Sequence, residues 1–138
     1  MEKISRNQEN FIIMTVLYNE IADQSVGIKE NFRDVDEIIS GITEIPFKEH
    51  SAYVQKMISS VLLNYGEIIS AFQPNLKNWK WERLPLLTQA VLLMSYAHIY
   101  YVEKIDKSIV INTAVELAKK YIEEKQAKFI NAILDEVL

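Results

Sequence analysis

Lysine side chains gather around a phenylalanine near the C-terminal end of this 138-residue sequence. The residues concerned are Lys119, Lys120, Lys125, Lys128 and Phe129. Lysines attract phosphate groups in a salt-dependent way, and an aromatic ring can stack on an unpaired base. A lysine run is also typical of a solvated helix face, and Phe129 shares an apolar stripe with Ile133, which favours a core position. On these residues alone, both interpretations stay open.

Side chains that catalyse reactions or hold metal ions are scarce. The chain has no cysteine and only two histidines, His50 and His98, which we place in separate helices. No HExxH, GxGxxG, GxxxxGK[ST] or GxSxG motif occurs. Neighbouring acids such as Glu123 and Glu124 point about 100° apart on a helix, so they do not converge on one substrate. We therefore expect no enzyme, metal site or cofactor, and a structural role with one hydrogen bond for His98.

Charge is distributed unevenly along the chain. The net charge of −4 argues, on its own, against a protein that binds nucleic acid. Residues 1–70 hold six basic and eleven acidic side chains, whereas residues 71–138 hold nine and eight. An anionic partner should therefore prefer the second half. The lack of cysteine agrees with a cytoplasmic location, and we find neither a signal peptide nor an apolar run of the ~20 residues that cross a membrane.

Hydrophobic spacing predicts helices along nearly the whole chain. We place them at about residues 8–23, 32–42, 54–72, 85–101, 108–122 and 126–137. Pro74 should end the third and longest helix, and Tyr101 should face inward at the end of the fourth. The start of the fifth helix stays open, since Ser108 or Thr113 could cap it. With only three glycines and three prolines, the sequence predicts an all-α bundle of about six to seven helices.

Three segments of the second half resemble the NusB family. WERLPLLTQAVLL (81–93) is similar to the leucine-rich opening of a family helix. IVINTAVELAKKY (109–121) resembles "vaINEAVELAKky", and KFINAILD (128–135) resembles "kFVNgvLD". In the first half, TVLYNE (15–20) is similar to "QaLYxxe". The resemblance implies one NusB-like domain with two packed helical subdomains, at about residues 1–75 and 76–138.

The resemblance also implies a role in transcription antitermination and termination. NusB proteins bind the boxA element of nascent ribosomal RNA leaders together with NusE, a small-subunit ribosomal protein, within the transcription elongation complex. Their RNA surface joins a basic N-terminal segment to the start of the last helix. The matching residues here are Lys3, Arg6, Lys119, Lys120, Lys125, Lys128 and Phe129. Tyr18 and Thr88 are the expected contacts to the protein partner.

The N-terminal segment departs from the family pattern "RRxARExAxQxLY". Only Arg6 matches an arginine; the second arginine position holds Asn10, and the usual glutamate is Phe11. Two further acids of the family pattern are replaced, one by Thr113 in the INTAVELAK segment and one by His98. Each lost phosphate contact removes about one unit from the salt dependence of binding. We therefore expect this segment to contribute less RNA affinity than in the family pattern.

A second hypothesis follows from that depletion. The chain could be a NusB-fold adaptor that works through protein contacts, or as a homodimer, with weakened RNA binding. A continuous basic groove between the N-terminus and Phe129 would favour the RNA-binding hypothesis. A neutral or acidic groove would favour the adaptor.

Overall fold

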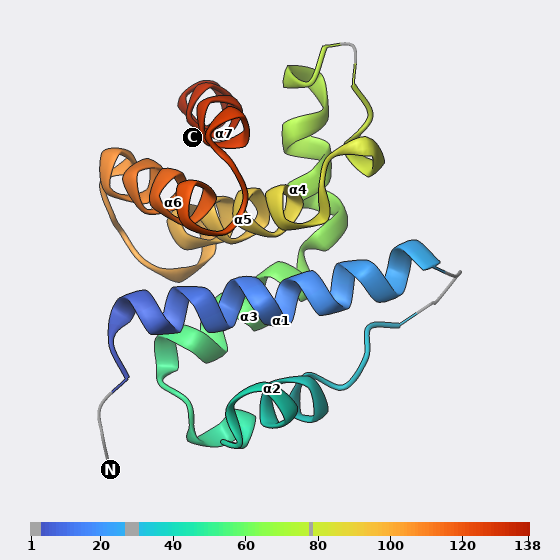
Figure 1. The fold of residues 1–138 in the computed structure, drawn as a ribbon, viewed down its shortest axis with the longest axis vertical. Coiled ribbons are helices and arrows are strands. Elements are labelled where there is room, and N and C mark those ends of the chain that lie inside the picture. Colours follow the sequence, from blue (N-terminus) through green and yellow to red (C-terminus); the bar gives the residue numbers. More distant parts are fainter. Residues whose placement is uncertain (1–3, 27–30, 78) are drawn as a thin grey trace.

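Helices account for the regular structure that the computed structural model describes, which covers residues 4–26, 31–77 and 79–138. Within these residues there are seven α-helices and no strand, so the all-α prediction is confirmed (Figure 1). They are α1 (Arg6–Val26), α2 (Val35–Thr43), α3 (Ala52–Leu63), α4 (Tyr65–Phe72), α5 (Leu86–Ala97), α6 (Lys107–Tyr121) and α7 (Glu124–Val137). Short turns η1 (Phe47–Glu49), η2 (Gln73–Asn75), η3 (Trp81–Arg83) and η4 (His98–Val102) connect them.

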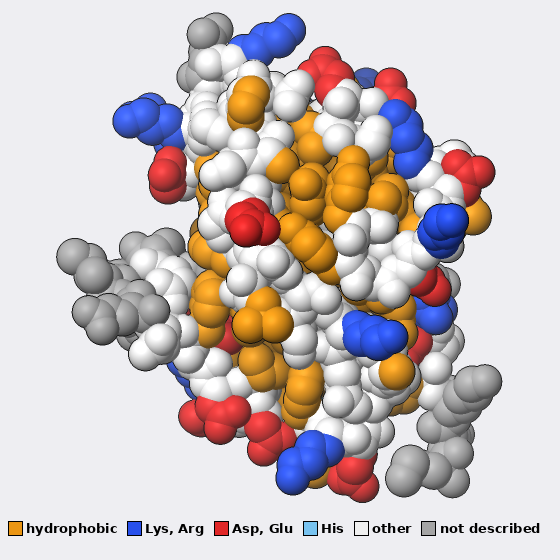
Figure 2. Space-filling model, turned by 180° about the vertical axis from the view of Figure 1, so that it is seen from behind, with side chains coloured by type: hydrophobic (Ala, Val, Ile, Leu, Met, Phe, Trp, Pro, Cys, Tyr) orange, Lys and Arg blue, Asp and Glu red, His pale blue; other side chains and the backbone are white. Residues whose placement is uncertain are grey.

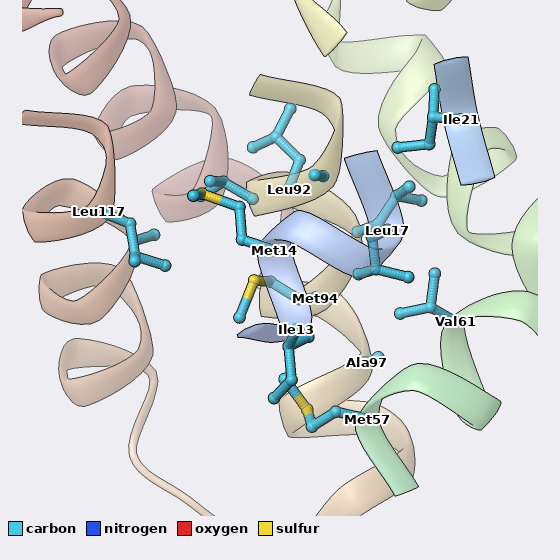
Figure 3. Close-up of a cluster of buried hydrophobic side chains, with 14 of the residues drawn as sticks. Ile13, Met14, Leu17, Ile21, Met57, Val61, Leu92, Met94, Ala97 and Leu117 are labelled. Atoms are coloured by element: carbon cyan, nitrogen blue, oxygen red, sulfur yellow. The ribbon is translucent and has the colours of Figure 1, made fainter. Parts of the chain in front are cut away.

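Helix α1 runs through the middle of the molecule and packs against three others. Helix α2 lies along one side of it, whereas α3 and α5 pack on its other sides (Figure 1). In Figure 3, Ile13 and Leu17 of α1 lie among side chains of two other helices. These are Met94 of α5, and Met57 and Val61 of α3. Ile13, Leu17 and Val61 have no solvent exposure. Burying such side chains is the main force that holds the three helices together.

The C-terminal half builds on α5, whose residues from Thr88 to Ser95 are all buried. Helices α6 and α7 pack closely against each other and against α5, and α4 contacts both α5 and α7. Most of the buried hydrophobic side chains belong to one continuous cluster that draws on both halves of the chain. The division into subdomains near residue 75 stays a prediction.

The expected third helix is interrupted, which corrects the prediction of one unbroken helix over 54–72. Asn64 leaves helical geometry at φ −117° and ψ 23°, and separates α3 from α4. Its side-chain Nδ2 donates to the carbonyl oxygen of Ser60 at 2.8 Å. An asparagine side chain that binds nearby backbone competes with helix continuation, and Gly66 adds a second weak helix former. Helix α1, with 21 residues, is therefore the longest.

Two other boundaries differ from the predictions. Asp106 caps α6, because its Oδ1 accepts from the backbone N–H of Ser108, so neither Ser108 nor Thr113 is the cap. Tyr101 is 38% exposed and not inward. The reason is that the chain widens after α5 into the π-helical turn η4, where the N–H of Glu103 donates to the carbonyl of His98. Adding a residue to the turn rotates the following side chains to another face.

Candidate nucleic-acid interface

Four lysines surround the junction between α6 and α7. Lys119 and Lys120 lie in the last turn of α6, and Lys125 and Lys128 lie in the first two turns of α7. All four are exposed, and none forms an ion pair with a carboxylate of the described chain. The structure therefore brings these predicted residues to one end of the helix pair with their charges available. Lys3 lies outside the described residues.

Phe129 lies in the second turn of α7, next to Lys128. Its ring is half-buried and packs against the hydrophobic core. The ring therefore contributes to the core and also reaches the surface, and its stacking on a base stays a prediction. A half-exposed aromatic ring beside unpaired lysines suits stacking on a base.

Arg6, the one matching arginine of the N-terminal segment, is engaged within the protein. Its Nε lies 3.4 Å from Oε1 of Glu9, and its Nη1 lies 3.8 Å from Oε1 of Glu103. The guanidinium carbon is 3.6 Å above the centre of the Tyr53 ring, a cation–π contact. About half of the side chain is exposed. The guanidinium group of Arg6 therefore already contacts two carboxylates and one aromatic ring within the protein.

His98 completes this arrangement from η4. Its Nε2 lies 2.8 Å from Oε1 of Glu103, and its ring meets the Tyr53 ring edge-on at 5.3 Å. The hydrogen bond from His98 is the main cause that lowers the pKa of Glu103, and the charges of His98 and Arg6 add to it. His98 is buried with this one side-chain hydrogen bond. The expectation of a structural histidine is confirmed.

Asn10 is buried where α1 meets α3. Its Oδ1 accepts a hydrogen bond of 2.5 Å from the hydroxyl group of Tyr53. Burial is the largest cause that raises the pKa of Tyr53 to about 12, so this hydroxyl stays protonated and continues to donate. The bond holds the Asn10 amide in place through its oxygen, and the amide nitrogen takes no part in it. No spacing in the sequence identifies this pair, because its two residues lie on different helices.

A groove runs between the first turns of α1 and helix α6. The rings of Phe11 and Tyr121 meet across it, with their centres 4.8 Å apart, and form a ridge. On one side of the ridge lies a hollow of about 400 Å³, which we call the inner hollow. It is lined by Asn7, Asn10, Ile109, Asn112, Thr113, Glu116, Leu117, Lys120 and Tyr121.

A second hollow, also of about 400 Å³, lies on the other side of the ridge, and we call it the outer hollow. Its lining is Ile4, Asn7, Gln8, Phe11, Ile12, Ile42, Thr43, Ile45, Lys120 and Tyr121. Asn7, Lys120 and Tyr121 belong to both hollows. Sequence reasoning identified only Lys120 of this shared set, since the lining comes from segments about a hundred residues apart.

The two predicted partner contacts differ in access. Tyr18 is 37% exposed on α1 and stays available to a partner. Thr88 is fully buried, and its hydroxyl donates to Oε1 of Gln126 at 2.9 Å. In this structure the Thr88 side chain joins α5 to α7 and offers no surface for the predicted partner contact.

Basic and acidic side chains are scattered over the face seen in Figure 2, mostly near its edge, and hydrophobic side chains lie between them. This face offers no continuous positive surface. Among the described residues, no group of three acidic, histidine or cysteine side chains could hold a metal ion. No helix in the described part of the chain has the length and hydropathy to cross a membrane.

Comparisons with known proteins agree with this architecture. Residues 8–138 match the NusB family. The transcription antitermination protein NusB of Listeria welshimeri is 34% identical over 107 residues, which cover 78% of this chain and 81% of that protein. The structure of T. maritima NusB superposes with a TM-score of 0.80 at 21% identity, covering 99% of this chain and 92% of that one.

A second similar structure contains antitermination factors NusB and NusE in complex with dsRNA. It superposes with a TM-score of 0.75 at 21% identity, and covers 96% of this chain and 94% of that chain. At such identities the structures establish a shared fold, whereas the match over residues 8–138 and the Listeria relative establish kinship. The chain belongs to the NusB family.

Proposed function

We propose that this protein is a cytoplasmic, non-catalytic transcription antitermination factor that binds single-stranded boxA-type RNA of ribosomal RNA leaders together with NusE. The observation that carries the proposal is the junction of α6 and α7, where four lysines without ion pairs in the described chain lie and where the half-buried Phe129 follows Lys128. Family membership and a similar structure that holds NusB, NusE and RNA support it.

The contacts of the basic residues indicate how RNA affinity is divided. The four lysines carry no internal ion pair in the described chain, so each can release counterions when a phosphate binds. Arg6 starts from contacts with Glu9 and Glu103, which a phosphate must replace. We infer that the C-terminal lysines contribute most of the electrostatic attraction and that Arg6 contributes little.

The NusE contact is assigned to the exposed part of α1 around Tyr18. The Tyr18 ring is 37% exposed, and tyrosine is enriched at protein interfaces because it combines an apolar ring with a polar end. With Thr88 buried, Tyr18 is the remaining predicted contact.

One observation favours the alternative, a NusB-fold adaptor or homodimer with weak RNA binding. The charged side chains that line the inner hollow of the groove between α1 and α6 are Glu116 and Lys120. Their charges are opposite, so the hollow is close to neutral. A neutral groove supplies little attraction for phosphates. The two functions differ in how strongly binding depends on RNA.

The deciding experiment measures binding by fluorescence anisotropy. A labelled boxA RNA and a scrambled RNA of equal length are titrated with the protein at low salt, with and without NusE. We expect preference for boxA RNA and tighter binding with NusE. Changing Lys119, Lys120, Lys125 and Lys128 to glutamine should abolish binding.

In the control variant, glutamine replaces Lys48 and Lys80, which are exposed and lie outside the candidate interface. This variant should bind RNA as the unchanged protein does. Absence of binding to either RNA under both conditions would rule out the RNA-binding proposal. Retention of NusE without any RNA dependence would instead favour the adaptor.

A further inference from the structure

We propose that the groove between α1 and α6 seats two consecutive unstacked bases of single-stranded RNA, one in each hollow, with the Phe11–Tyr121 ridge between them. The inference rests on the proposed RNA-binding function and adds where bases are read. The inner hollow would distinguish one base from another, and the outer hollow would accept any base.

The size and shape of the groove suit this occupant. Each hollow measures about 400 Å³, within the range of about 300–1,000 Å³ that is usual for small-ligand sites. The two hollows meet at a ridge of two aromatic rings, with 36% of the Phe11 side chain exposed. Aromatic rings that separate two splayed bases are a common device in recognition of single-stranded RNA.

The inner hollow is lined by groups that can bond to the edge of a base. Oδ1 of Asn10 is occupied by the Tyr53 hydroxyl, so its amide nitrogen is left to donate. The exposed Asn112 amide offers both a donor and an acceptor. Thr113 uses its hydroxyl proton on the carbonyl of Ile109 at 3.0 Å, which leaves its oxygen to accept. Amides of this kind read the edges of unpaired bases.

Charge in the inner hollow favours a base over a bare phosphate. Glu116 and Lys120 are its charged residues, and they offset each other. The Glu116 carboxylate would repel an anion but can accept from an exocyclic amine or a ring N–H. A neutral, amide-rich hollow therefore fits a nucleobase.

The outer hollow has a different character. Four isoleucines and Phe11 line it, together with polar groups from Asn7, Gln8 and Thr43. Apolar walls and an aromatic ring contact the face of a base, which all four bases share. This side is thus suited to hold a base without reading its edge.

Lys120 is placed to bind the phosphate that joins the two bases. It lines both hollows, and its Nζ lies 5.4 Å from the centre of the Tyr121 ring. Like its neighbours near the helix junction, it has no acidic partner within the described residues. Its position on the ridge connects this groove to the lysines of the α6–α7 junction.

The test combines single side-chain changes with single abasic sites in the RNA. Asn112→Ala removes an exposed amide of the inner hollow, and Asn31→Ala removes an exposed amide outside both hollows and outside the α6–α7 junction. Binding of boxA RNA, with NusE present, is measured for each variant and for a series of RNAs that each lack one base. Circular dichroism and the Tm confirm that each variant is folded.

We expect Asn112→Ala to weaken binding of the intact RNA about tenfold, the loss that goes with one well-made base contact. That loss should vanish for one abasic RNA and persist for the others, and Asn31→Ala should bind normally. Tyr121→Leu should weaken binding about tenfold or more, again with relief at abasic positions next to the ridge.

Two results would overturn the inference and leave the proposed function standing. The first is boxA binding by Asn112→Ala and Tyr121→Leu that equals that of the unchanged protein. The second is a loss that stays the same for every abasic RNA. If the unchanged protein binds no RNA, the proposed function fails and the inference fails with it. A groove that instead binds a peptide of NusE would show losses that depend on NusE and not on RNA bases.

Discussion

The hydroxyl group of Tyr53 donates a 2.5 Å hydrogen bond to Oδ1 of Asn10 and so joins α3 to the second turn of α1. Asn10 stands where the family pattern has an arginine, and it is only 4% exposed. Thr113 and His98, which stand where the pattern has acids, line the same narrow hollow as Asn10 and Tyr53. The three departures are therefore neighbours in space, although they are scattered in the sequence.

Because the three replacements lie together, the missing arginine has to be considered with the two missing acids. Asn10, Thr113 and His98 bring no carboxylate into this hollow, and the acid that His98 contacts, Glu103, is not part of its lining. The three side chains therefore form a polar arrangement in which hydrogen bonds, such as the one between Asn10 and Tyr53, satisfy buried groups.

The first prediction concerns the bond between Tyr53 and Asn10. Tyr53→Phe removes the donor and leaves a buried carbonyl oxygen unsatisfied, which typically costs about 1–3 kcal/mol. We expect urea denaturation to show a loss of that size in the free energy of unfolding. Tyr100→Phe is the matched control, because the Tyr100 side chain is 50% exposed, and it should change stability by less than about 0.5 kcal/mol. Equal stability of the two variants would contradict the prediction.

The second prediction concerns Glu20, a fully buried acid on α1. One of its oxygens accepts from the backbone N–H of Arg33 at 2.9 Å, and the other has no partner among the described residues. Its pKa is raised from 4.5 to about 7, with burial as the largest cause; the hydrogen bond and charge of Arg33 lower it, and the charges of Asp23 and Asp34 raise it. The folded protein therefore holds this proton more tightly than the unfolded chain.

Stability from Glu20 is thus fully present below pH 4.5 and is lost as the pH rises through about 7. Its size is about 3 kcal/mol. Glu20→Gln keeps an acceptor for Arg33 but cannot ionise, so its free energy of unfolding should not show this loss. The measurement is urea denaturation of both proteins at several pH values between 4 and about 8. Parallel pH curves for the two proteins would show that Glu20 keeps its ordinary pKa.

The sequence predicted the helices better than the groove. Apolar spacing locates each helix because a helix that packs on a core must repeat its buried side chains every three to four residues. It missed the break at Asn64, because α3 and α4 keep the same apolar spacing through the interruption and only a local side-chain bond marks it. The apolar spacing likewise gives no sign of the π-helical turn that exposes Tyr101.

The candidate site was only partly predictable for a related reason. The lysines around Phe129 are close in sequence, so the chain itself shows their cluster. The groove needs Asn10 and Thr113 to meet, and nothing within one sequence states that two helices so far apart pack together. The burial of Thr88 was missed because a threonine at a helix start is compatible with either a surface or a core position.

The third prediction concerns the contact between α1 and α3 in the core. Leu17→Ala removes a side chain with no solvent exposure and leaves a cavity among α1, α3 and α5. Such changes cost about 2–5 kcal/mol. Leu63→Ala is the same substitution at an 84% exposed position, and should change stability by less than about 0.5 kcal/mol. Similar unfolding midpoints for the two variants would show that the packing at Leu17 is not as tight as described.

The final prediction separates the contributions of Arg6 and Lys128 to RNA binding. Lys128 has no acidic partner in the described chain, whereas Arg6 already contacts Glu9, Glu103 and the Tyr53 ring. On single-stranded RNA, one phosphate contact adds about 0.7 to the slope of log affinity against log salt. Lys128→Gln should therefore lower the slope by about this amount, and Arg6→Gln should leave it nearly unchanged. Anisotropy titrations of boxA RNA at four salt concentrations measure both slopes, and a larger decrease for Arg6→Gln would show that RNA displaces its internal contacts.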